Sequence, residues 1–482
     1  MQGCVADSAL SPLLRLVTSS VVADISRGEV ATSPRGVPLV VARAALDDGP
    51  WFVLVATHRE ADELEEDLAA WLGDENDVVT WPAWDVAPFE RVSPDTVTMG
   101  RRAQIRHRLA NGDAPRVIIA TARSALQVVP PRGDARELVV GEEVDRDELL
   151  RWLIANGYRR EPQVEHRGDV AVRGDIVDVW LSHLNEPIRV ELFGDDIERI
   201  TVFDVTTQRS VEPLERCDVF PAREWQPSDD VRATAQRAVA THPALAEVLQ
   251  PLCDGEFVDG MESWLGWLCP QASTLVNVLE TSRKLLVVDP ERVRQCSEDI
   301  LLEESELADV MAATWGLREA PLLHRTMHDA FGDRQPDVVV RSDIRGSVSW
   351  PVTDPPVCQG DVHRLATHVR SDDVERALLV VGSLATQSRL ISLLEDTGLA
   401  VADAYEDDHH ADLCVIVAPL ARGLSTPTAV VWSEADFTGR RIPRRQPRGG
   451  QRPLHPAAGI QFSRTATGRP LVRLRLPLAR GG

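Results

Sequence analysis

Two short segments carry arginine and phenylalanine side chains that could bind another protein. Arg173 lies in RGDVAVRGDIVDVW (167–180), and Arg189 and Phe193 lie in PIRVELF (187–193). Both segments alternate like half-buried strands, so the aliphatic residues of the second face one way while Arg189 and Phe193 face the other. Arginine beside an exposed aromatic ring is the composition of interface hot spots. The pattern therefore predicts a protein-binding face.

A structural role would explain the same residues without a partner. Phe193 would then fill a local groove, and Arg189 would pair with Glu191 or Asp195. Composition alone leaves the choice between packing and recognition open.

A second group of cations lies in GRRAQIRHRL, residues 100–109, where the spacing predicts a helix. Its candidate DNA contacts are Arg101, Arg102, Arg106 and Arg108. Arg101 and Arg108 share a helix face, so they could bind phosphate groups. A solvated helix face accounts for the same pattern without any ligand.

The sequence lacks the residue patterns that nucleotide binding, metal binding and nucleophilic catalysis require. A Walker A loop needs glycines followed by a lysine that reaches the phosphates, but the single lysine, Lys284, follows no glycine loop. The acids that end VVWSEAD (430–436) fit ordinary strand-end polarity, and YEDDHHAD (405–412) fits a solvated loop better than a metal site. The seven cysteines are far apart and are expected to be reduced. We therefore predict no catalytic, cofactor-binding or metal-binding residue in this chain.

Charge limits the surfaces that could bind nucleic acid. The net charge is −23, and eleven of the 52 basic residues lie between 439 and 482, where no acid occurs. The rest of the chain carries 41 basic residues against 75 acidic ones, so as a whole it would repel DNA. Because no long uncharged apolar run and no signal sequence appear, the chain is expected to be cytoplasmic, without contact to a membrane.

Hydrophobic patterns predict the elements that position these residues. The run WFVLVA (51–56) is followed by a capping box at Thr57 and Glu60, and RVIIAT (116–121) repeats the strand pattern. Buried strands alternating with helices indicate a parallel, doubly wound sheet. Further helices are expected at 95–109, 146–155, 229–241 (with Ser228 as N-cap), 259–268 and 386–396, and further strands within 285–295, 377–382, 412–418 and 428–436.

The fold class that follows is α/β and multidomain. We expect a doubly wound domain with a first part at 1–135 and a second at 226–349, an inserted α+β domain at 136–225, a linker at 350–362, a small α/β domain at 363–438 and a disordered basic tail at 439–482. The tail combines eleven arginines with seven glycines and six prolines, which cannot build a core. A shifted reading frame in a GC-rich gene would give the same composition, so both origins stay open.

Four segments resemble, in order, the N-terminal part of bacterial transcription-repair coupling factors. They are 81–102, 172–180, 187–210 and 421–441, and the likeness extends from about residue 10 to 441. In that family the N-terminal module is similar to UvrB, with a nucleotide site that has lost its function, and it recruits UvrA in nucleotide excision repair. Its UvrA contacts correspond to Arg173, Arg189 and Phe193, so the resemblance implies a UvrA-binding site at these residues.

This chain differs from UvrB and from full-length coupling factors, and these differences limit the activity that we expect of it. UvrB carries a P-loop and an aromatic-rich hairpin that probes DNA, whereas this chain has no P-loop and two tyrosines. Full-length coupling factors continue into an RNA-polymerase-binding domain, a DNA translocase that uses ATP and magnesium, and a C-terminal domain that masks the UvrA site. The resemblance ends soon after Arg441, so it implies a truncated chain that binds UvrA. Damaged DNA would be reached indirectly, and RNA polymerase only through the missing domains. The alternative function is that of an ATP-driven DNA translocase, so whether the chain is an enzyme stays open.

Overall fold

The computed structural model describes residues 28–47, 49–73, 77–279, 282–342, 350–371, 374–403 and 411–439. Two predictions fall mostly outside this part of the chain, namely the basic tail at 439–482 and the histidine-containing segment at 405–412. Within the described ranges, no helix is long and apolar enough to cross a membrane.

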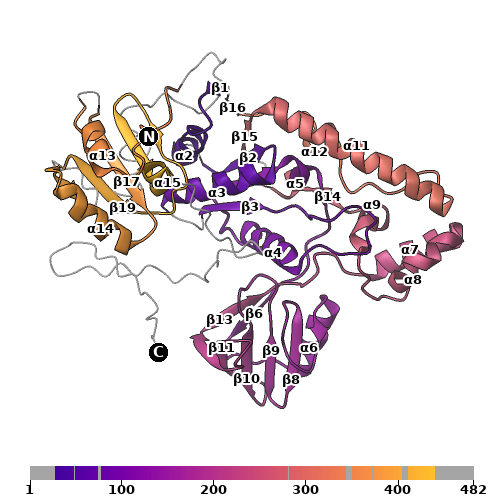
Figure 1. The fold of residues 1–482 in the computed structure, drawn as a ribbon. Helices are drawn as coiled ribbons and strands as arrows, with labels where there is room; N and C mark the ends of the chain where they lie inside the picture. The colour runs from indigo at the N-terminus through magenta and orange to yellow at the C-terminus, as the bar shows by residue number, and fades with distance from the viewer. Residues whose placement is uncertain are drawn as a thin grey trace, which may run out of the picture. The chain divides into compact units, whose positions relative to one another are not determined.

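A six-stranded sheet is formed by strands that come before and after the inserted domain in the sequence (Figure 1). Its order is β1-β16-β15-β2-β4-β3, and every pair is parallel. Along β2, Val53 packs into one core cluster, whereas Phe52 and Leu54 pack into another, so apolar layers cover both faces. The strands are β1 (Gly28–Ala31), β2 (Trp51–Val55), β3 (Val78–Trp81), β4 (Val117–Thr121), β15 (Lys284–Val288) and β16 (Val338–Arg341). The predicted doubly wound α/β sheet is confirmed.

Several helices that border this sheet begin at side-chain caps. The bordering helices are α2 (Val37–Asp47), α3 (His58–Leu72), α4 (Thr96–Ala110), α5 (Ala122–Leu126), α10 (Leu275–Val278), α11 (Pro290–Trp315) and α12 (Met327–Phe331). Thr57 Oγ1 accepts from the Glu60 amide, and the Glu60 carboxylate accepts from the Thr57 amide, which confirms the predicted capping box of α3. Asp95 caps α4, the helix that carries the candidate DNA contacts.

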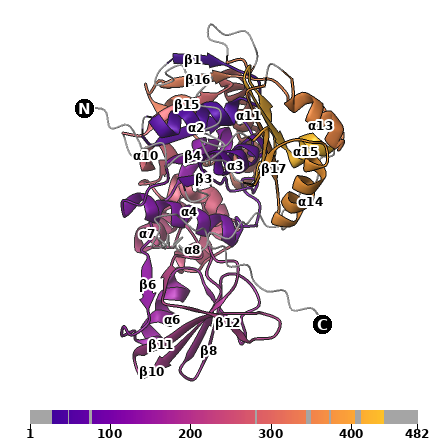
Figure 2. The same cartoon turned by 90° about the vertical axis from the view of Figure 1, so that its left-hand side faces the viewer.

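The inserted domain contains a second sheet with the order β12-β11-β10-β9-β8-β7 (Figure 2). Its pairs are antiparallel, except that β7 runs parallel to β8. One face packs against α6 through Leu149 and Leu153, and Val190 lies in the same core. The elements are β7 (Arg159–Arg160), β8 (Asp169–Arg173), β9 (Ile176–Val179), β10 (Ile188–Phe193), β11 (Asp196–Phe203), β12 (Ser210–Leu214), α6 (Arg146–Ala155) and the antiparallel pair β6 (Arg136–Val139) and β13 (Arg216–Val219).

A stretch of short helices follows the inserted domain. Its elements are α7 (Asp229–Thr241), η3 (Pro243–Leu245), α8 (Ala246–Cys253), η4 (Met261–Trp264), α9 (Leu265–Leu268) and β14 (Ser273–Thr274), which pairs with β5 (Val128–Val129). Ser228 caps α7 as predicted. The single helix expected at 259–268 is wrong, because a 3-10 turn precedes the short α9. Gly260 has a φ of 83°, a left-handed conformation that an α-helix cannot include.

A five-stranded sheet forms the small α/β domain. Its order is β18-β19-β17-β21-β20, and its pairs are parallel except β20 with β21. The elements are β17 (Arg376–Val381), β18 (Val401–Ala402), β19 (Leu413–Val417), β20 (Leu424–Ser425), β21 (Ala429–Ser433), α13 (Val362–Val369), α14 (Leu384–Glu395) and α15 (Glu434–Thr438). The predicted linker at 350–362 is packed, since Trp350 and Val352 lie in the core around α2 and Cys358 lies in the core of the small domain.

Candidate protein-binding site

Strand register places Arg173, Arg189 and Phe193 on one face of the inserted sheet. Arg173 on β8 pairs with Ile176 on β9, which pairs in turn with Glu191 on β10. Glu191 lies two residues from both Arg189 and Phe193, so all of these side chains leave the sheet on the same side. From strand spacing, the Cα atom of Arg173 lies about 12 Å from those of Arg189 and Phe193. We call this surface the outer face, because the opposite side packs against α6.

Phe193 is the exposed aromatic residue of the outer face. It ends β10, directly before Gly194, whose φ of 65° turns the chain into β11. Its side chain is 77% exposed. The alternative in which Phe193 fills a local groove is therefore wrong, because none of the described elements covers the ring at the tip of this hairpin.

Arg189 is held in place by a buried carboxylate. Its Nε and Nη2 atoms donate to the two oxygens of Asp178 at 2.7 and 2.9 Å, and Nη1 donates to the Gln208 carbonyl at 3.3 Å. The guanidinium lies 4.9 Å from the ring centroid of Phe203. Hydrogen bonding to Asp178 raises the pKa of Arg189. A bidentate pair of this kind fixes the direction of the guanidinium.

The partner of Arg189 differs from the two expected acids. Asp178 lies directly opposite Arg189 on β9 and is 2% exposed, whereas Glu191 pairs with Arg199. Sequence reasoning missed Asp178 and the underlying Phe203. The available signal was the alternation in GDIVDVW, which puts Asp178 on the polar side of β9, but the register that sets it opposite Arg189 is not visible in the sequence.

Arg173 forms the third corner of the outer face. It is exposed at the end of β8, and its Nη2 atom donates to the Pro162 carbonyl at 3.2 Å. Beneath these polar groups, Val164, Ala171 and Phe203 form a small buried cluster. The outer face thus combines an exposed ring and two arginines with a packed base, an arrangement suited to protein recognition.

Arg102 and Arg106 of α4 correct the prediction of a DNA-binding helix face. Their side chains are 0% and 6% exposed, and both pair with Glu224, at 2.7 and 3.4 Å. The Arg102 guanidinium lies over the rings of Trp81 and Trp84, at 4.6 and 4.7 Å from their centroids. Burial lowers the pKa of both arginines, and Glu224 opposes this shift. Neither guanidinium therefore lies on an exposed helix face, where the sequence had placed it.

Arg101 and Arg108 are part-buried on the same helix, with side chains that are 24% and 16% exposed. Arg101 lies 3.8 Å from Glu65, and Arg108 pairs with Asp113 at 3.0 Å. Both cations therefore have acidic neighbours that a phosphate would have to displace. Their DNA contact stays a prediction.

The turn between β1 and α2 lies where phosphate-binding loops occur in doubly wound folds. It contains Arg35, whose Nη1 donates to the Gly423 carbonyl and to Asp436, each at 2.9 Å. Arg35 also pairs with Asp354. Arg35 therefore connects the β1–α2 turn to Gly423 and Asp436 of the small α/β domain.

Comparisons with known proteins agree on a single family. A family model described as "UvrB interaction domain" matches residues 137–225, compared with the 136–225 expected from sequence. A transcription-repair-coupling factor of Mycobacterium bovis is 31% identical over 460 residues, which cover 85% of this chain and 37% of that protein. That of Myxococcus xanthus is 34% identical over 276 residues, with 53% and 23% covered, and that of Bacillus subtilis is 22% identical over 297 residues, with 57% and 25% covered. The chain therefore spans little more than a third of the first relative's length.

Proposed function

Because this chain corresponds to the N-terminal part of bacterial transcription-repair coupling factors, we propose that it acts in transcription-coupled nucleotide excision repair by binding UvrA. The proposed activity is recruitment through protein binding in the cytoplasm. The outer face of the inserted domain would be the docking surface, with damaged DNA reached through UvrA.

The observation that carries this proposal is the exposure of Phe193 beside two arginines. Phe193 is 77% exposed, and an aromatic ring beside arginine has the composition of interface hot spots. Arg189 is fixed by Asp178, so little side-chain entropy would be lost when a partner binds it. A rigid arginine next to an exposed ring can contribute to binding with little loss of side-chain entropy.

The test is the affinity of purified UvrA for the wild-type chain and for a variant with Arg173→Ala and Phe193→Ala. Each hot-spot residue is expected to contribute about 2 kcal/mol or more, or roughly 30-fold in affinity. The matched control is Arg151→Ala with Ile154→Ala, which removes an exposed arginine and a 42% exposed aliphatic side chain from α6 of the same domain. Equal UvrA affinities for the two double variants would refute the proposal.

The runner-up function, ATP-driven DNA translocation, is proposed only for full-length members of the family, in which ATP, magnesium and RNA polymerase would bind other domains. For this chain we propose no ATP hydrolysis, because its single lysine, Lys284, follows no glycine-rich P-loop. Phosphate release from ATP, stimulated by DNA and catalysed by the pure chain, would contradict this.

A further inference from the structure

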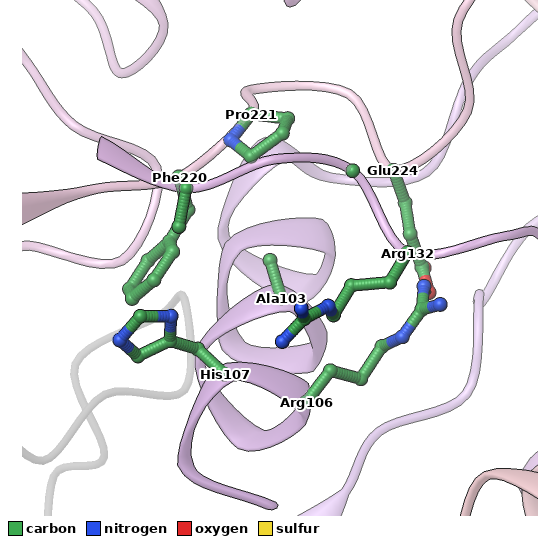
Figure 3. Close-up of a pocket in the computed structure, with 9 residues that line it drawn as sticks. Ala103, Arg106, His107, Arg132, Phe220, Pro221 and Glu224 are labelled. Atoms are coloured by element: carbon green, nitrogen blue, oxygen red, sulfur yellow. The ribbon is translucent and has the colours of Figure 1, made fainter. Parts of the chain in front are cut away.

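A pocket with an excess of positive charge lies where α4 meets the chain segments that enter and leave the inserted domain (Figure 3). Arg106 and His107 come from α4, Arg132 from the entering segment, and Phe220 and Glu224 from the leaving segment. In Figure 3 the Arg106 side chain runs toward Glu224, while Arg132 extends across the space in front of the helix.

The charges around this pocket are not balanced. Two buried guanidinium groups, those of Arg102 and Arg106, share the single carboxylate of Glu224, which is 2% exposed. One Glu224 oxygen also accepts from Trp84 Nε1 at 3.1 Å. An uncompensated charge away from water is costly, so this arrangement favours an additional negative group nearby.

Arg132 adds a second cation on the open side of the pocket. Burial lowers the pKa of the Arg106 guanidinium, and the like charge of Arg132 adds to this shift. Two cations that face one space repel each other unless an anion lies between them. The geometry therefore joins a buried arginine and an exposed arginine around one small volume.

Arg106, which lines the pocket, has N–H groups left for such an anion, because its Nη1 and Nη2 atoms each carry a second hydrogen. Its Nη1 reaches Glu224 Oε1 at 3.4 Å and its Nη2 donates to the Pro130 carbonyl at 3.0 Å, whereas its buried Nε has no hydrogen-bond partner. A buried donor of this kind is normally satisfied. His107 borders the same space, with its ring centroid 5.2 Å from that of Phe220.

We propose that this pocket binds a small oxyanion of the phosphate type, held by Arg106 and Arg132. A tetrahedral oxyanion offers several acceptors to two guanidinium groups at once. Free phosphate or a phosphate of a nucleic acid backbone could supply this chemistry. The net charge of −23 repels a polyanion far more than a single small ion, so the free ion is the occupant that fits better.

The test is calorimetric titration of the full chain with inorganic phosphate at constant ionic strength. Arg132→Gln is expected to weaken phosphate binding by about tenfold or more, the loss of one charge-assisted hydrogen bond. Arg151→Gln makes the same charge change at an exposed site on α6 and is expected to leave phosphate affinity unchanged.

A second titration uses a single-stranded oligonucleotide at the same phosphate concentration. Binding that Arg132→Gln weakens, seen with phosphate alone or with both ligands, supports the proposal with the free ion as occupant. Such binding seen only with the oligonucleotide supports the phosphate chemistry and identifies the nucleic acid backbone as its source. No saturable binding of either ligand in the millimolar range, or equal loss in the two variants, would overturn it.

Discussion

The outer face of the inserted domain and the inner side of α4 use arginine in opposite ways. On the outer face, Arg189 is paired with a buried carboxylate yet stays 17% exposed, at the surface that carries Phe193. On α4, Arg102 is fully buried between Trp81, Trp84 and Glu224. One arginine is held at the surface beside an exposed ring, while the other has become part of the interior.

The difference lies in what surrounds the cation and not in its sequence context. A helix with four arginines in eight positions was a candidate phosphate-binding site, but its i, i+4 pair at Arg102 and Arg106 turns inward to one carboxylate. The single arginines of the strands stay at the surface because alternation fixes their side of the sheet. Strand alternation therefore predicted the shared face of Arg189 and Phe193, whereas local charge density did not predict the burial of Arg102 and Arg106.

The largest expected effect is the loss of the interior carboxylate. Glu224→Ala leaves two buried guanidinium groups without their acid and is expected to lower the free energy of unfolding by about 3–5 kcal/mol. Glu191→Ala breaks the exposed pair with Arg199 and should cost at most about 1 kcal/mol. Urea unfolding followed by tryptophan fluorescence measures both, and similar losses in the two variants would remove the distinction between the two regions.

Asp67 provides a buried carboxylate at a third place, the contact between α3 and the small α/β domain. It accepts from the amides of Ala421 and Arg422 at 3.1 and 3.4 Å, and its side chain is 1% exposed. Burial raises the pKa of Asp67 to about 6, against the attraction of Arg422. Here the cost of burial exceeds the benefit of pairing.

Asp67→Asn is therefore expected to change how stability depends on pH. A carboxyl whose pKa is raised on folding favours the folded state below its unfolded pKa of 3.8, and this contribution is lost as the pH rises to about 6. The variant should equal wild type near pH 4 and exceed it by up to about 3 kcal/mol at pH 8, if the amide oxygen keeps the two backbone hydrogen bonds. Urea unfolding across this range tests it, and a stability difference independent of pH would contradict the assignment.

Local signals account for the parts of the fold that were predicted. The capping box at Thr57, the N-cap at Ser228 and the apolar run of β2 depend on residues close together in the chain, and each was confirmed. The helix expected at 259–268 was wrong for a local reason as well, because Gly260 within it adopts a left-handed conformation.

The candidate sites also differ in whether local sequence signals predicted them. Alternation placed Arg189 and Phe193 on one face, but the family resemblance was needed to add Arg173 and to assign UvrA to that face. The burial of Arg106 could not be foreseen, because Glu224 lies 118 residues away and reaches α4 only after the inserted domain has folded. Long-range contacts of this kind leave no local pattern in the sequence.

A smaller effect concerns the orientation of Arg189. Asp178→Asn removes the charge that fixes the guanidinium while keeping the side-chain size, and it is expected to weaken UvrA binding by about tenfold, or 1.4 kcal/mol. The effect should disappear in an Arg189→Ala background, because Asp178 acts through Arg189 alone. A double-mutant cycle measures this coupling, and equal losses with and without Arg189 would show that Asp178 has only a structural role.

The smallest expected effect separates binding from folding on the outer face itself. Phe193→Ala should change the free energy of unfolding by less than about 0.5 kcal/mol, because a ring that is 77% exposed gives up little buried area. Phe203→Ala, on the same face but fully buried beneath Arg189, should cost about 3–5 kcal/mol. The two variants delete the same atoms, so unfolding in urea compares burial alone. A loss above about 1 kcal/mol for Phe193→Ala would mean that the ring packs against the domain in solution and is not held ready for a partner.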